Sequence, residues 1–129
     1  MTQIFITAGI PYDQKERIIS LCKRMIKSDN IEFQGLYMHC GNSYSTDLKK
    51  VKEVRDQSIK NFAALTKQLQ LAGINCPNMG AGSTPSCSLP TPPPEMGIIT
   101  EMHPGNYIFY GKNLNQETIK IFLGITCNC

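Results

Sequence analysis

Three polar segments of the sequence combine glycine with residues that can bind a ligand or carry a proton. They are residues 39–44 (HCGNSY), 80–86 (GAGSTPS) and 101–107 (EMHPGNY). In the second segment, glycine lets backbone N–H groups turn toward a phosphate, and the hydroxyl groups of Ser83 and Thr84 add donors. This pattern predicts an anion site, with an ordinary Gly/Ser/Pro loop as the alternative. It is neither a Walker loop nor a GxGxxG fingerprint, because the required lysine and glycine spacing is missing.

The other two segments each contain one of the two histidines of the chain. A lone histidine is more often structural than functional. His39, however, is followed by Gly41 and Tyr44 in a polar stretch, and this setting favours a ligand contact. Gly105, directly before Asn106, marks a tight turn where a backbone amide can face a ligand.

Alternating strand-like and helix-like stretches must position these segments. The stretches that favour strands are residues 3–8, 31–38, 76–81, 98–101 and 106–110. Helical spacing of apolar residues predicts helices over residues 13–28 and 46–72, and Gly73 is a suitable stop for the second helix. The expected buried residues of the first helix are Ile18, Leu21, Cys22, Met25 and Ile26. Those of the second are Val51, Val54, Ile59, Phe62, Leu65 and Leu69.

This alternation is the pattern of parallel βαβ units, which build either a doubly wound sheet or a (β/α) barrel. In both folds, ligands bind just past the carboxyl ends of the strands. The three polar segments occupy such positions. A complete barrel needs eight strands, eight helices and roughly 250 residues, so a chain of 129 residues would form about half of one.

Composition excludes several other classes of protein. The net charge of +3 is too small and too scattered for a nucleic-acid surface. No apolar run approaches the ~18 residues of a membrane span, and the N-terminus lacks the features of a secretory signal. We therefore expect a cytoplasmic protein whose six cysteines are free thiols. Cys127 and Cys129 lack the two further ligands of a metal site, so no metal ligand is assigned.

In their order along the chain, the three segments resemble the D-serine dehydratase and D-threonine aldolase family. These are pyridoxal-phosphate (PLP) enzymes with an alanine-racemase-like barrel. The resemblance rests on HCGNSY, GAGSTPS and TEMHPGNYIFY and covers roughly residues 3–110. HPGNY favours the D-serine dehydratase branch. The implied fold is α/β, a partial (β/α) TIM-type barrel of the alanine racemase N-terminal domain type over residues 1–110, with a divergent tail over residues 111–129.

The resemblance also implies residues that bind the cofactor. His39 and Tyr44 would lie beside the cofactor ring, and His103 would point toward its pyridine nitrogen. The residues implied to hold the phosphate are Gly82, Ser83, Thr84, Gly105 and Asn106. In the full-length family, PLP is the electron sink for the conversion of a D-amino acid, D-serine, into pyruvate and ammonia.

Two parts of the family's machinery have no counterpart in this sequence. The Schiff-base lysine of the family lies on an early strand, whereas Lys15 and Lys23 fall on a predicted helix. The zinc ligands of the family lie in a C-terminal β-domain, so zinc is not expected in this chain. Asn42 replaces a histidine of the family motif, and Gly111 replaces an aspartate. No catalytic residue is assigned.

Three interpretations follow from these observations. The first is a truncated D-serine dehydratase-like protein that is inactive alone. The second is a non-catalytic cofactor-binding or interaction remnant of that family, and the third is an unrelated flavodoxin-like module that binds a nucleotide or flavin phosphate. The order of the three motifs disfavours the third. Because half a barrel exposes strand edges and apolar helix faces, we expect self-association or a dimer.

Overall fold

The computed structural model describes residues 9–105 of the chain. Its helices are α1 (Lys15–Ile26), α2 (Leu48–Leu71) and α3 (Thr84–Cys87), with short 3₁₀ helices η1 (Gly41–Ser43) and η2 (Pro94–Ile98). Its strands are β1 (Gly35–His39), β2 (Asn78–Gly82) and β3 (Glu101–Met102). The strands predicted over residues 3–8 and 106–110, and the proposed boundary at residue 110, lie outside the described residues.

The three strands form one parallel sheet in the order β1-β2-β3. β1 pairs with β2 along its whole length, from Gly35 opposite Asn78 to His39 opposite Gly82. β3 pairs in parallel with the second half of β2. The predicted α/β class with parallel strands is therefore confirmed.

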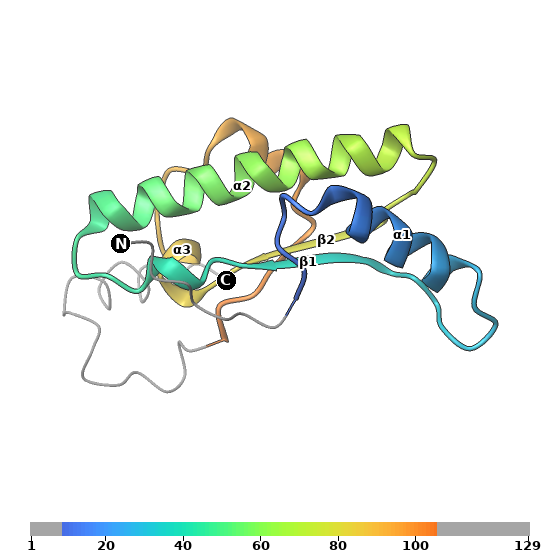
Figure 1. Ribbon diagram of the computed structural model, residues 1–129. Coiled ribbons are helices and arrows are strands. Elements are labelled where there is room, and N and C mark those ends of the chain that lie inside the picture. The colour runs from blue at the N-terminus through green and yellow to red at the C-terminus, as the bar shows by residue number, and fades with distance from the viewer. Residues whose placement is uncertain (1–8, 106–129) are drawn as a thin grey trace.

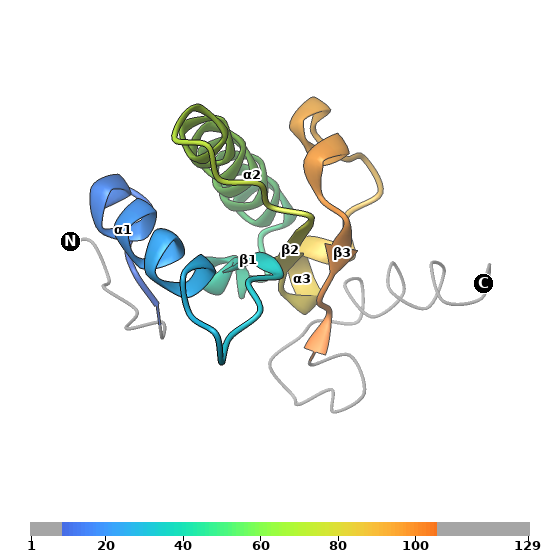
Figure 2. The ribbon, with the colours of Figure 1, turned by 90° about the vertical axis from the view of Figure 1, so that its right-hand side faces the viewer.

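Helices α1 and α2 lie on the same face of this sheet (Figure 2). One buried cluster joins α2 to β2 and consists of Ile59, Phe62, Met79 and Ala81. A second joins α1, α2 and the start of the following loop, and consists of Ile18, Cys22, Leu65, Leu69 and Ile74. The long helix α2 runs along the strands (Figure 1), so its apolar stripe covers the sheet over most of its length.

Both ends of α2 are fixed by local hydrogen bonds. Asp47 caps the first turn, and its carboxylate accepts from the backbone N–H of Lys49 at 2.9 Å. At the other end, Gly73 adopts φ +77°, as predicted for a helix stop. The backbone N–H of Ile74 then donates to the carbonyl of Leu69 at 2.9 Å. Leu69 and Ile74 are also buried together, which completes a Schellman motif with its hydrophobic contact.

The apolar stripe of α2 agrees with the prediction, with one addition. Val51, Ile59, Phe62, Leu65 and Leu69 are buried, and Val54 is half-buried. The addition is Arg55, which is 2% exposed. Its long side chain shares the buried side of α2 with the apolar residues, a position that the helical spacing of apolar residues does not reveal.

The prediction for α1 is partly wrong. Ile18 and Cys22 are buried and Met25 is half-buried, but Leu21 and Ile26 are 42% and 50% exposed. Because α1 packs against α2 along one side, its other apolar flank faces no described element.

Two further differences concern the ends of the strands and the loop after β2. β1 begins only at Gly35, so residues 31–34 are not part of the strand that was expected over residues 31–38. The loop expected after β2 contains the short helix α3. Of the strand expected over residues 98–101, Ile98 belongs to η2 and only Glu101 lies in β3. Among the described residues, no helix is long and apolar enough to cross a membrane.

Candidate functional site at the carboxyl edge of the sheet

The carboxyl edge of the sheet brings the three polar segments together. β1 ends at His39, directly opposite Gly82 at the end of β2. Just past the end of β3, the backbone N–H of His103 donates to the carbonyl of Ala81 at 3.1 Å. Residues that are far apart in the sequence therefore meet at one edge, as expected for parallel strands.

On the sheet face opposite the long helices, Tyr37 lies between the two histidines. The Tyr37 hydroxyl is 3.1 Å from Nδ1 of His39, and its ring centroid is 4.8 Å from that of His103, with the planes at 59°. Nε2 of His103 is also 3.4 Å from Oε2 of Glu101. The sequence analysis gave no role to Tyr37 or Glu101. Tyr37 and His39 are two residues apart on a strand, and this spacing places both side chains on the same face of the sheet.

The Tyr37 hydroxyl keeps its proton over a wide pH range. Burial raises the pKa of Tyr37, and the neighbouring thiols of Cys40 and Cys87 and the hydroxyl of Tyr44 raise it further. A protonated hydroxyl can donate to an imidazole nitrogen that carries no hydrogen. The Tyr37–His39 contact is therefore a hydrogen bond that a neutral histidine can accept.

A chain of buried hydroxyl groups connects the loops after β1 and β2. Ser43, Ser83 and Ser86 are 0%, 1% and 3% exposed. Oγ of Ser83 is 2.5 Å from Oγ of Ser43 and 2.9 Å from Oγ of Ser86. Ser83 and Ser86 also form a capping box at the start of α3. Figure 1 shows that α3 lies beside the end of β1. The hydrogen bond between Ser43 and Ser83 joins the loops that follow β1 and β2 at this place.

The donor and the acceptor can be assigned for the hydrogen bonds between these serine hydroxyl groups. Ser43 donates its single hydroxyl hydrogen to the carbonyl of Cys40 at 2.6 Å, so Ser83 must be the donor to Ser43. The backbone N–H of Ser83 donates to Oγ of Ser86 at 2.9 Å. Both donors of Ser83 are thus used inside the protein. A phosphate would have to displace Ser43 or Ser86 to receive either of them.

The other predicted site residues differ in their accessibility. Thr84 is 0% exposed at the first turn of α3, whereas Tyr44 is 48% exposed in the loop after η1. Gly82 has φ +136°, and a Cβ atom there would lie 2.5 Å from Sγ of Cys87. Gly105 is exposed, and its N–H donates to the carbonyl of His103 at 3.0 Å. Asn106 lies outside the described residues.

The cysteines near this edge are suited to packing rather than to nucleophilic chemistry. Cys40 is 2% exposed. Burial raises the pKa of the Cys40 thiol and that of the Cys87 thiol. Hydrogen bonds to both thiols oppose this increase without cancelling it. Because the thiolate is the reactive form, a raised pKa lowers reactivity at neutral pH. All cysteines of the described part of the chain are free thiols.

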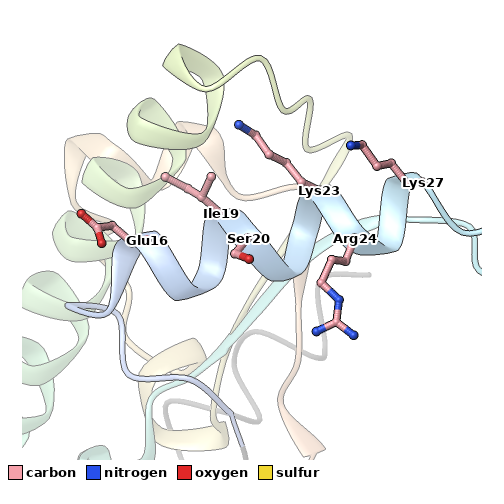
Figure 3. A pocket seen from close by; sticks show the side chains of 6 residues that line it. All are labelled: Glu16, Ile19, Ser20, Lys23, Arg24 and Lys27. Carbon is pink, nitrogen blue, oxygen red and sulfur yellow. The ribbon is translucent and has the colours of Figure 1, made fainter.

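None of the described lysines lies on a strand or in one of the three polar segments. They belong to α1 and α2, or directly follow α1, and both helices pack on the opposite face. A depression on α1 is lined by residues that include Lys23 and Lys27, whose side chains project from the surface of this helix (Figure 3). The strands and polar segments at this edge, within residues 9–105, therefore contain no lysine for a covalent bond to a cofactor aldehyde. The same residues hold no group of three or more His, Cys, Asp and Glu that could bind a metal.

The chain is similar to known proteins over part of their length. No family model matches it. A D-serine dehydratase of Dictyostelium discoideum is 36% identical over 84 residues, which are 61% of this chain and 20% of that protein. The chain thus spans about a fifth of the length of this curated relative.

Solved structures share the fold at low identity. A D-threo-3-hydroxyaspartate dehydratase from a Delftia species matches with a TM-score of 0.71 and 19% identity, over 83% of this chain and 27% of that one. An alanine racemase-like protein from Idiomarina loihiensis matches with a TM-score of 0.70 and 20% identity, over 94% of this chain and 30% of that one. A D-threonine aldolase from Filomicrobium marinum matches with a TM-score of 0.60 and 20% identity, over 76% of this chain and 29% of that one.

The resemblance first drawn from the three polar segments is confirmed by these matches. At about a fifth identity, the solved structures show the fold alone, while the D-serine dehydratase match rests on sequence. This chain is a partial match to the family of D-serine dehydratases, D-threonine aldolases and alanine racemase-like proteins, and it covers only part of their length.

Proposed function

We propose that this chain carries cofactor-binding residues of a D-serine dehydratase-like, fold-type III PLP enzyme and does not dehydrate D-serine by itself. The observation that carries the proposal is the meeting of His39, Gly82 and His103 at the carboxyl edge of the sheet. The helices on one face support a segment of a (β/α) barrel, because a doubly wound sheet carries helices on both faces.

In this proposal, the residues bind and orient the cofactor. His39 and Tyr44 lie beside the ring, and His103 faces the pyridine nitrogen. The proposed phosphate residues are Gly82, Ser83, Thr84, Gly105 and Asn106. When bound, PLP supplies an electron sink for chemistry at the α-carbon of a D-amino acid. Because no lysine of residues 9–105 lies on a strand or in one of the three polar segments, this part of the chain is proposed to hold the cofactor without a covalent bond.

The hydrogen bonds of Ser83 limit how the phosphate is held. A phosphate oxygen accepts hydrogen bonds, and both donors of Ser83 already serve Ser43 and Ser86. Ser83 therefore contributes by shaping the turn into α3, unless ligand binding breaks one of these bonds. Ser83 joins the loops on either side of the proposed phosphate position.

Binding of pyridoxine 5′-phosphate tests the proposal. This analogue lacks the aldehyde, so it cannot form adducts with surface lysines. We expect it to bind more tightly than inorganic phosphate, as measured by calorimetric titration, and we expect His103→Ala to weaken it by about five-fold, the equivalent of one hydrogen bond. The His103 side chain is 44% exposed, so we expect this variant to keep the fold, which circular dichroism verifies. Gln68→Ala, on the exposed side of α2, serves as the control and should bind like the wild type.

Three outcomes would count against this function. If pyridoxine 5′-phosphate binds no more tightly than inorganic phosphate, the proposed site for the cofactor ring is wrong. Preference for flavin mononucleotide would favour a flavodoxin-like module instead. Formation of pyruvate from D-serine and PLP, faster than with PLP alone, would show that the chain is a complete catalyst.

We further infer that the isolated chain self-associates through the apolar flank of α1. Leu21 and Ile26 on this helix are large and exposed, and exposed apolar groups favour association. The double variant Leu21→Gln/Ile26→Gln is expected to shift the chain toward a monomer in sedimentation velocity. Leu71→Gln, at the far end of α2 and 83% exposed, is the matched control and should sediment like the wild type. A monomeric wild-type chain would contradict this inference.

A further inference from the structure

Tyr37 contacts both histidines of the candidate site and yet is not among the residues that resemble the family's cofactor contacts. It lies on β1 and is 55% exposed on the sheet face opposite the long helices. Its hydroxyl is bonded to His39, and its ring packs against that of His103. One side chain thus connects the histidine at the end of β1 with the histidine that directly follows β3.

We propose that Tyr37 is a positioning residue, which orients His39 through its hydroxyl group and His103 through its ring. The proposal rests on the function proposed above, since it assigns a role to the group that holds the ring-binding residues. Tyr37 acts here through the two histidines and is not itself assigned a contact with the ligand.

When the Tyr37 hydroxyl donates to Nδ1 of His39, this hydrogen bond selects the nitrogen of the imidazole that carries the hydrogen. Burial raises the pKa of Tyr37, so its hydroxyl stays protonated and can donate to Nδ1 of His39. A neutral imidazole that accepts at Nδ1 carries its hydrogen on Nε2. His39 then offers a donor at Nε2, in an orientation set by β1.

The contact with His103 depends on the absence of a side chain at Gly80. A Cβ atom at Gly80 would lie 2.8 Å from Nε2 of His103 and 3.2 Å from Cδ2 of Tyr37. The two rings therefore meet over the backbone of β2. Glu101, 3.4 Å from Nε2 of His103, lies at the same ring, so His103 is bounded by Tyr37, Gly80 and Glu101.

The ligand-free protein allows a direct test of this arrangement. The sequence has two histidines, so a long-range ¹H–¹⁵N spectrum of the full chain contains two imidazole rings, which His39→Ala and His103→Ala assign. Tyr37→Phe removes the hydroxyl and keeps the ring, whereas Tyr37→Leu removes both. Gly80→Ala keeps the tyrosine but crowds both rings, His103 more closely than Tyr37. Tyr12→Phe changes a tyrosine that is also 55% exposed and serves as the matched control.

Each variant has a distinct expected spectrum. Tyr37→Phe should shift the ¹⁵N signals of His39 and leave those of His103 nearly unchanged. Tyr37→Leu should shift both rings, Gly80→Ala chiefly His103, and Tyr12→Phe neither. Unchanged His39 signals in Tyr37→Phe, or unchanged His103 signals in Tyr37→Leu, would overturn the proposal. Circular dichroism verifies that each variant keeps the wild-type content of helix, so that a shift reports the site and not unfolding.

Titration with pyridoxine 5′-phosphate separates this proposal from the proposed function. Tyr37→Phe should weaken binding by about five-fold, and Tyr37→Leu more strongly, with no change in the weak binding of inorganic phosphate. Wild-type affinity in Tyr37→Leu would overturn the positioning role. If the wild type itself does not bind the analogue, the proposed function fails, and the spectra alone decide whether Tyr37 orients the histidines.

Discussion

Replacing Gly35 with alanine is expected to destabilise the fold by about 3–5 kcal/mol, the sum of a backbone strain and a steric overlap. Gly35 opens β1 with φ +143°, a conformation that residues with a side chain rarely adopt. A Cβ atom there would lie 1.9 Å from the backbone carbonyl oxygen of Asn78. Because Asn78 is the strand partner of Gly35, this overlap is relieved only by separating β1 from β2.

Urea unfolding, followed by far-ultraviolet circular dichroism, measures this loss. Gly97→Ala is the matched control, because a Cβ atom at Gly97 would meet nothing within 4 Å and its φ is not positive. We expect the control to change the free energy of unfolding by less than about 0.5 kcal/mol. Equal midpoints for Gly35→Ala and Gly97→Ala would show that β1 and β2 do not pair as described.

Replacing Arg55 with methionine is expected to cost about 2–3 kcal/mol of stability, because part-buried hydrogen bonds from a charged donor are lost. The Arg55 side chain is 2% exposed and donates from Nε to Oδ1 of Asp56 at 2.8 Å. Its terminal nitrogens donate to the backbone carbonyls of Leu89 and Thr91. Arg55 thus fastens the proline-rich segment after α3 to helix α2.

The charge of Asp56 supports this interpretation of Arg55. Burial alone would raise the pKa of Asp56, but hydrogen bonds from Lys52 and Arg55 outweigh it and lower the pKa. Methionine keeps most of the volume of arginine, so the loss reports the missing donors and charge rather than a cavity. Arg24→Met, on the exposed side of α1, is the control. If both variants unfold at the same urea concentration, Arg55 does not hold the segment.

The sequence predicts the parts of the fold that follow a regular period. The stripe from Val51 to Leu69 marks α2, and Gly73 ends that helix by a conformation that glycine adopts readily. The three described strands lie close to apolar stretches of the sequence. Their alternation with helices predicts parallel pairing, which the register from Gly35 to His39 confirms.

Features that depend on contacts between distant residues could not be predicted in this way. Helix α3 is four residues long and shows no period; the capping box of Ser83 and Ser86 stabilises it. β1 begins at Gly35 because its partner β2 begins at Asn78, the residue opposite. Arg55 is buried because backbone carbonyls beyond α3 accept its donors.

The same distinction applies to the candidate site. The common edge of His39, Gly82 and His103 follows from their positions at the ends of parallel strands. The link through Tyr37 and the donor direction of Ser83 depend on side-chain geometry across strands and loops. A pattern along the chain names the residues of such a site, and the neighbours in space decide which of their atoms are available.

The sheet face opposite the long helices has a consequence for anyone who wants to prepare this chain. That face carries Tyr37, His39, Glu101 and His103, so water wets it without the penalty that an apolar barrel interior would incur. Large exposed apolar side chains lie instead on the flank of α1 and at Leu71, the last residue of α2. Solubility can therefore be engineered by substituting the exposed apolar residues of the helices, while the residues on the sheet face proposed to bind the ligand stay unchanged.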